Sequence, residues 1–310
     1  MTATIRTVGG DLATSLLGPT YMHEHLIIDT PLVAETMAHI HLPSVDEGVA
    51  EVRRCIAAGV RTMVDAMPAA AGRDPERLTR VSVLTGMRVV AATGLHTARY
   101  YDEVAWTREE SEDQLSDRFI SDIEEGIDRH DYRGQEIERS EARAGIIKVA
   151  TLAAKWTEPE ERLFAAAAMA AAATGVPILT HTEGGLGGMA QIQRLMSLGV
   201  GPERIALSHT DKIEDRGYHR DMLSTGVSLC YDQALREPGN TVGLIEEMTE
   251  AGFVDQLMVG TDGARRSLWA SLGGGPGLAA LYTDLGSRLA PEVARSMFVN
   301  NPARYLTMRR

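Results

Sequence analysis

Residues 21–28 read Tyr-Met-His-Glu-His-Leu-Ile-Ile, an apolar run that contains two histidines separated by one residue. Alternate side chains of an extended strand point to the same face of a sheet. The run therefore predicts a strand over about residues 19–28, from which His23 and His25 project side by side. Two imidazoles on one face make half of a metal site. Since an isolated His-x-His pair also occurs by chance, its interpretation depends on the rest of the chain.

Further apolar runs follow this stretch, and segments with helical character separate them. The strand-like runs are residues 61–66, 88–94, 144–150, 177–181, 204–209, 227–232 and 256–262. The helical segments are residues 44–58, 75–85, 158–174, 188–198, 215–225, 240–251, 277–289 and 291–300. Continuous apolar strands that alternate with helices indicate a parallel sheet covered by helices on its outer side.

This alternation predicts an α/β protein with a single (β/α)8 TIM barrel over residues 1–310. A barrel of this kind needs about 250 residues, so the chain has room for an insertion. We place a helical insertion at about 97–140, with an acidic helix from Arg108 to Arg129 whose charged face is solvated. A doubly wound open sheet is the alternative, but no glycine-rich dinucleotide fingerprint follows the first strand.

The balance of charge excludes several kinds of partner. Lysine and arginine number 31 and aspartate and glutamate 43, which gives a net charge of −12. A chain this acidic, with no basic block, is not expected to bind nucleic acid or an anionic membrane. No run is long enough for a signal peptide or a membrane span, and Cys55 and Cys230 give no disulfide framework. We expect a cytoplasmic protein with two buried, reduced thiols.

Ionisable side chains recur where the predicted strands end. His181, His209 and Asp262 end their runs, and Lys148 lies near the end of residues 144–150. In a TIM barrel the carboxyl ends of all strands meet at one face. We therefore expect these residues to join His23 and His25 in one metal site, although any one of the histidines alone could be a hydrogen-bonded core residue.

Lys148 stands in an otherwise apolar strand, where burial favours the neutral amine. A neutral amine can add CO2 and become a carbamate, which is an anionic oxygen ligand able to bridge two metal ions. Two divalent ions with a carbamate, Asp262 and a bridging hydroxide carry a net charge of about +1, which can polarise a substrate oxygen. An ion pair between Lys148 and Asp262 is the alternative.

These motifs together resemble the phosphotriesterase-related family of the amidohydrolase superfamily, most of all its lactonase members. The resemblance covers nearly the whole chain and rests on residues 18–25, 72–74, 91–94, 146–148, 180–182, 208–211, 260–262 and 301–304. It implies that the metal ligands are His23, His25, Lys148, His181, His209 and Asp262. The more buried ion would take His23, His25 and Asp262, and the more exposed one His181 and His209, with carboxylated Lys148 between them.

The resemblance implies two divalent ions, with zinc favoured and manganese, cobalt or iron open, and at the level of the family a homodimer. We expect hydrolysis by a metal-bridging hydroxide, with Asp262 as the proton acceptor. The expected substrate is a lactone, such as a sugar lactone with or without a phosphate, or a carboxylic ester. The alternatives are a phosphotriester, an amide, or no turnover in a metal-bound binding protein.

Candidate substrate contacts follow the later strands. Cations stand at Lys212, Arg236, Arg265 and Arg266, and His96 and Tyr100 follow the third strand. Together the cations suggest a substrate with a carboxylate or phosphate. Relatives that bind phosphate are expected to have a lysine after the seventh strand and a tyrosine three positions after the first arginine. Here Arg236 and Leu268 stand there, so phosphate recognition is open.

Overall fold

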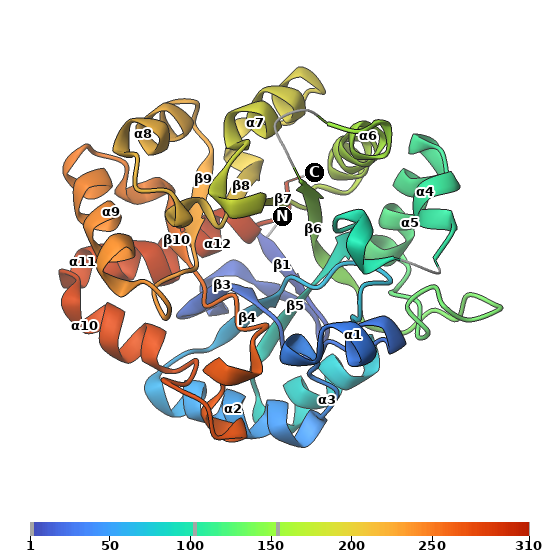
Figure 1. Ribbon diagram of the computed structural model, residues 1–310, viewed down its shortest axis with the longest axis horizontal. Helices are drawn as coiled ribbons and strands as arrows, with labels where there is room; N and C mark the ends of the chain where they lie inside the picture. The colour runs from blue at the N-terminus through green and yellow to red at the C-terminus, as the bar shows by residue number, and fades with distance from the viewer. Residues whose placement is uncertain (1–2, 102–103, 153–155, 310) are drawn as a thin grey trace.

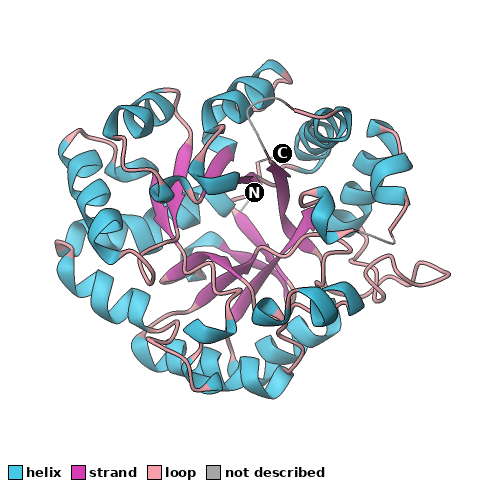
Figure 2. Cartoon of the chain, viewed as in Figure 1, coloured by secondary structure: helices cyan, strands magenta, loops and turns pink. Residues whose placement is uncertain are grey.

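Eight parallel strands surround the centre of the molecule, and the helices lie outside them (Figures 1 and 2). The computed structural model describes residues 3–101, 104–152 and 156–309. The strands are β3 (Thr20–Glu24), β4 (Thr62–Asp65), β5 (Arg88–Gly94), β6 (Ala144–Thr151), β7 (Ile178–Thr182), β8 (Ile205–Ser208), β9 (Ser228–Tyr231) and β10 (Leu257–Val259). They pair in sequence order. A hydrogen bond from Asp262 N to His23 O (2.9 Å) joins the two ends of the sheet, so the expected TIM barrel is confirmed.

The sequence encodes two separate apolar layers. One side chain or more from each strand fills the inside of the barrel, among them Met22, Val64, Ile146 and Leu179. A larger cluster lies between the strands and the helices and includes neighbours such as Tyr21, Ile147 and Ile178. Because strands buried on both faces need apolar residues at successive positions, the runs are continuous and do not alternate.

The helices that cover the barrel are α1 (Pro31–Thr36), α2 (Val45–Ala58), α3 (Pro75–Thr85), α6 (Glu158–Thr174), α7 (Gly188–Ser197), α8 (Arg216–Ser224) and α9 (Pro238–Glu250). Ser44 caps α2 by accepting a hydrogen bond from Glu47 N, and Gly59 and Gly175 end α2 and α6 in the left-handed conformation. These caps satisfy helix-end groups that no intrahelical bond reaches.

The two C-terminal helical segments lie close to where the sequence pattern predicts them, and each contains a π-helical turn. The π-helical turn Leu281–Leu285 runs directly into α10 (Gly286–Arg288), and the turn Ser296–Asn300 joins α11 (Pro291–Arg295) to α12 (Asn301–Leu306). An antiparallel hairpin that the sequence analysis missed, β1 (Thr4–Thr7) with β2 (Gly10–Ala13), packs beside β5 and β6.

The segment at 97–140 departs from the expected single acidic helix. It contains α4 (Trp106–Glu109) and α5 (Glu112–Glu124), separated because Ser111 caps α5 together with Gln114. Its charged residues are not all solvated. Asp122 is fully buried and accepts hydrogen bonds from Arg73 Nη1 (3.0 Å) and Thr93 Oγ1 (2.7 Å). A buried ion pair thus ties α5 to the barrel, which the charge pattern alone did not reveal.

No helix in the described ranges has the length and apolar character needed to span a bilayer.

Candidate metal centre

The six predicted ligands converge at the carboxyl-end face of the barrel. His23, His25, Lys148, His181, His209 and Asp262 all line one cavity of about 390 Å³. The ring centroids of His23 and His25 lie 5.2 Å apart, and those of His181 and His209 lie 4.5 Å apart. His25 Nε2 is 3.6 Å from Asp262 Oδ1. Residues that are up to 239 positions apart in the chain therefore form one cluster of nitrogen and oxygen donors.

The first strand is shorter than predicted, and its geometry is less regular. β3 ends at Glu24, so His25 follows the strand and does not lie within it. The pairing of β3 with β4 also shifts register between Tyr21 and Glu24. Met22 lies in the barrel interior and His23 contacts Lys148 from the same side. A shift of this kind re-aims side chains, so simple alternation does not explain how the two histidines meet.

Two of the cluster residues have left-handed backbone conformations. His209 has φ 67° and Asp262 has φ 46°, and each follows the end of a strand. A non-glycine residue in this region costs about 1–3 kcal/mol, and such residues concentrate at functional sites. The expected strand over residues 256–262 stops at Val259, which allows Asp262 to turn its carboxylate toward the histidines.

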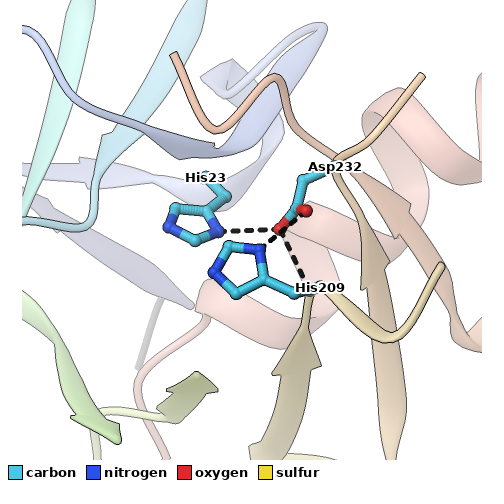
Figure 3. Close-up of side chains that lie close together, drawn as sticks. All are labelled: His23, His209 and Asp232. Carbon is cyan, nitrogen blue, oxygen red and sulfur yellow. Dashed lines mark hydrogen bonds and ion pairs between the residues drawn. The ribbon is translucent and has the colours of Figure 1, made fainter. Parts of the chain in front are cut away.

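Asp232 is a site residue that the sequence analysis missed. Its Oδ2 lies 2.9 Å from His23 Nδ1 and its Oδ1 lies 2.8 Å from His209 Nδ1 (Figure 3). At these lengths the atoms are hydrogen-bonded. In each ring Nε2 is then the nitrogen that remains to bind a metal ion. Asp232 follows β9 directly, so the rule that ionisable residues at strand ends meet would have found it.

The acidity of these groups follows from burial and from their neighbours. Burial lowers the pKa of His23 well below its usual value, and lowers the pKa of His181 to about 3. Burial opposes ionisation of Asp232, but the His209 and His23 imidazoles hold its pKa well below the usual range. Neutral imidazoles beside ionised carboxylates are the states in which these side chains bind metal ions.

Lys148 lies on β6 and is 1% exposed. Its Nζ donates to Ser208 Oγ (2.9 Å) and lies 3.5 Å from His23 Nε2. Among the described residues, Lys148 therefore forms no ion pair with Asp262, which was the alternative interpretation. Burial lowers the pKa of Lys148 to about 8, so the neutral amine is readily accessible, as the sequence analysis expected.

The donor set fits a divalent metal ion. His25 Nδ1 is buried and has no hydrogen-bond partner among the described residues. His23, His25 and Asp262 present ligand atoms within 4.8 Å of one another. Nitrogen and carboxylate donors in this combination are those that zinc and neighbouring transition metals prefer.

His181 is held by a carboxylate that the sequence analysis also missed. Its Nε2 lies 3.0 Å from Glu183 Oε2, and Glu183 forms an ion pair with Arg99 at 3.3 Å. Arg99 belongs to the loop after β5 and Glu183 to the loop after β7, so the pair joins two loops at the cavity. Because Nε2 is engaged, Nδ1 is the nitrogen of His181 that remains for a metal ion.

The predicted substrate contacts divide into three groups. The cavity is lined by five of them, His96, Tyr100, Lys212, Arg236 and Arg265, and also by His39, which was not predicted. Arg236 donates to backbone carbonyls at the strand ends. Arg266 does not line the cavity, because its Nη1 donates to His41 O (2.7 Å). This hydrogen bond ties Arg266 to the loop after β3, and the expected substrate contact of this residue stays a prediction.

Comparison with known proteins identifies relatives along the whole chain. A sequence model of the phosphotriesterase family matches residues 3–306. The phospho-furanose lactonase of Mycoplasmopsis agalactiae is 33% identical over 232 residues, which make up 74% of this chain and 66% of that protein. The matched part is thus slightly less than two thirds of that relative.

Solved structures of similar proteins superpose on nearly the whole chain. An amidohydrolase from Mycoplasma synoviae superposes with a TM-score of 0.93 at 28% identity, over 99% of this chain and 93% of that chain. A lactonase from Listeria monocytogenes superposes with a TM-score of 0.91 at 26% identity, over 99% of this chain and 100% of that chain.

Proposed function

Because the chain belongs to the phosphotriesterase family, we propose that it is a hydrolase that uses two divalent metal ions to open lactones with an anionic substituent, such as phosphorylated sugar lactones. The family is one of binuclear metal-dependent enzymes. The names of two relatives, a phospho-furanose lactonase and a lactonase, support this substrate class.

The observation that carries the proposal is a donor cluster beside uncommitted cations. The cavity that holds the six candidate ligands is also lined by Lys212 and Arg265. In the described part of the chain, neither side chain has a hydrogen bond or ion pair to a protein group. An anionic substituent on the substrate would give these two cations a partner, and arginine can bind a carboxylate or phosphate through two donors at once.

The protein residues have separable roles in ring opening. His23, His25, His181, His209 and Asp262 would hold the ions, which when bound lower the pKa of water toward 7 and polarise a carbonyl oxygen. Asp262 accepts the proton of the attacking water and delivers it to the ring oxygen as the ester bond breaks. Lys212 and Arg265 hold the substituent, so that the carbonyl lies at the donor cluster.

We also propose that Lys148 is carboxylated and that zinc is the native metal. The proposal for Lys148 is supported by its burial and by the absence of an opposite charge within hydrogen-bond distance of Nζ among the described residues. Mass spectrometry of the intact protein under native conditions should find the added CO2, and metal analysis of protein purified without added metal should find zinc. A Lys148→Ala variant, whose activity returns with a short carboxylic acid and added metal, would support the same role.

A panel of lactones tests the proposed function. Protein loaded with zinc and bicarbonate should open five-membered sugar lactones, detected as acid release, and should prefer phosphorylated or carboxylated ones over neutral ones. An activated phosphotriester and an aryl amide serve as comparison substrates. Faster turnover of the phosphotriester would replace the proposal with a phosphotriesterase. No turnover of any substrate by protein with two bound ions would indicate a binding protein.

A further inference from the structure

Arg236 was expected to contact substrate, but its hydrogen bonds lead elsewhere. It lies in the loop after β9, and its side chain is 16% exposed. Nη1 donates to Asp232 O (3.2 Å) and Thr261 O (3.0 Å), and Nη2 donates to Asp262 O (2.6 Å). Nη2 also lies 3.4 Å from Asp262 Oδ2. Both terminal nitrogens of the guanidinium are therefore committed to the protein.

With these contacts, every backbone N–H and C=O group of the Thr261–Asp262 dipeptide has a hydrogen-bond partner. Thr261 N donates to Glu24 Oε1 (2.8 Å), and Asp262 N donates to His23 O (2.9 Å). The hydroxyl of Thr261 also bonds to the Glu24 carboxyl group. Since Arg236 takes both carbonyls, every backbone polar group of the dipeptide is paired.

The dipeptide needs this support because of where it lies. It follows β10 at the seam where the last strand meets the first, and Asp262 is in the left-handed conformation at φ 46°. The seam is tight, since a Cβ on Gly260 would come 2.6 Å from His23 N. A strained residue keeps its conformation only where its surroundings fix it.

We propose that Arg236 is a positioning residue that, with Glu24, fixes the Asp262 carboxylate, and that it does not bind the substrate anion. This inference rests on the proposed lactonase function for its kinetic test. It assigns anion binding to Lys212 and Arg265, which line the same cavity, and it explains why an arginine suits this position. Only a planar fork of donors reaches three carbonyls at once.

The test compares Arg236→Met and Arg236→Lys in zinc-loaded protein on one sugar lactone with and without a phosphate. We expect kcat to fall about 100-fold for both substrates, as misplacement of a catalytic group by about 1 Å can cause, with KM nearly unchanged. Arg236→Lys should also lose activity, because lysine keeps the charge but lacks the fork. Arg265→Met, in contrast, should raise KM for the phosphorylated lactone only.

A readout independent of turnover keeps the proposal separate from the proposed function. Amide hydrogen exchange over residues 257–265 should speed up in Arg236→Met, and zinc should be lost to a chelator more readily than from wild type. Arg129→Met, which removes an exposed arginine paired with Glu76, should change neither. If wild type opens no lactone, the proposed function fails, while exchange and zinc retention still decide the role of Arg236.

A different result would overturn the inference. If Arg236→Met raises KM for the phosphorylated lactone alone and leaves both hydrogen exchange and zinc retention as in wild type, Arg236 binds the anion. If Arg236→Lys retains full kcat, the charge suffices and the carbonyl contacts have no catalytic role.

Discussion

The Asp232 carboxylate orients two imidazole rings in the cavity. Its two oxygens hold His23 Nδ1 and His209 Nδ1, and its backbone carbonyl accepts from Arg236. Glu183 does the converse for His181, because it engages Nε2 and leaves Nδ1. The carboxylates thus determine which nitrogen of each candidate ligand remains to bind a metal ion, and they do not need to touch the ion themselves, a common arrangement at metal centres.

Replacing Asp262 by asparagine should abolish most turnover and leave most of the metal in place. The amide oxygen can still serve as a donor, but the side chain can no longer accept a proton. We expect kcat for lactone opening to fall by about 10²–10⁴, the usual contribution of a general base. Metal content per chain should be measured on the same sample. Near wild-type rates in this variant would exclude Asp262 as the proton acceptor.

Glu183 offers a second test at the level of one residue. Glu183→Ala should weaken zinc retention about 10–100-fold, because the orienting partner of His181 is lost. Glu183→Gln keeps an acceptor oxygen for Nε2–H and should restore most of it. Competition with a chromogenic chelator measures both. Equal retention in the alanine and glutamine variants would show that His181 does not depend on this contact.

Among the elements, the loops after the strands and the β5–β6 contact position the site. Gly94 ends β5 beside Lys148, and its φ of 95° is in the left-handed region. A Cβ there would lie 2.0 Å from Lys148 O. Glycine is therefore required by the closeness of the two strands as well as by the conformation.

Gly94→Ala should consequently disturb the strand that carries Lys148. Gly86 provides a matched control, since it has a similar φ of 78° and an added Cβ would meet nothing within 4 Å. Gly86→Ala should cost about 1 kcal/mol of unfolding free energy from the backbone alone. Gly94→Ala should cost several times more in urea unfolding and should also reduce zinc binding. Equal losses would mean that β6 can shift without strain.

The contact of α8 with β9 predicts a pH dependence. His219 Nε2 bonds to Ile213 O (2.9 Å) and its Nδ1 to Tyr231 Oη (2.9 Å), and burial lowers the pKa of His219. A folded-state pKa below the unfolded value of about 6.5 means that the unfolded chain binds the proton first. The stability from His219 is therefore full above pH 6.5 and is lost as the pH falls through the lower, folded-state pKa.

Other buried groups titrate in the same range, so the prediction concerns a difference. Between pH 6.5 and 4.5, metal-free wild type should lose more unfolding free energy than His219→Gln, as measured by urea titration at several pH values. If the unfolding free energies of wild type and variant fall in parallel with pH, His219 is not buried in the neutral state.

For the whole molecule, metal binding should act as a cross-link of the barrel. The candidate ligands come from or follow β3, β6, β7, β8 and β10, so ions bound there connect strands on several sides. Zinc at 1,000 times its Kd should add about 4 kcal/mol to the unfolding free energy. A chelator should remove this gain. The increase in unfolding free energy should persist in His41→Asn, because His41 lies outside the cluster, and should shrink in His209→Asn. An increase of equal size in both variants would place the ions elsewhere.

The sequence by itself determined the barrel and the convergence of its ligands. Apolar runs and caps mark the strands and helices locally, and the parallel topology then brings His181, His209 and Asp262 to one face wherever the strands end. For this reason the six candidate ligands could be named from their positions alone, and all six line the same cavity.

Tertiary structure alone decided how those ligands are held. Contacts between distant segments produce the register shift in β3 and the left-handed backbone at Asp262. They also place backbone carbonyls within hydrogen-bond distance of Arg236, which would otherwise be solvated. A pattern along the chain contains the identity of a side chain but not its partners. Arg266 and Arg236 look alike in sequence, yet one fastens a loop and the other fastens the strand ends, because only the closed barrel fixes which carbonyls lie within their reach.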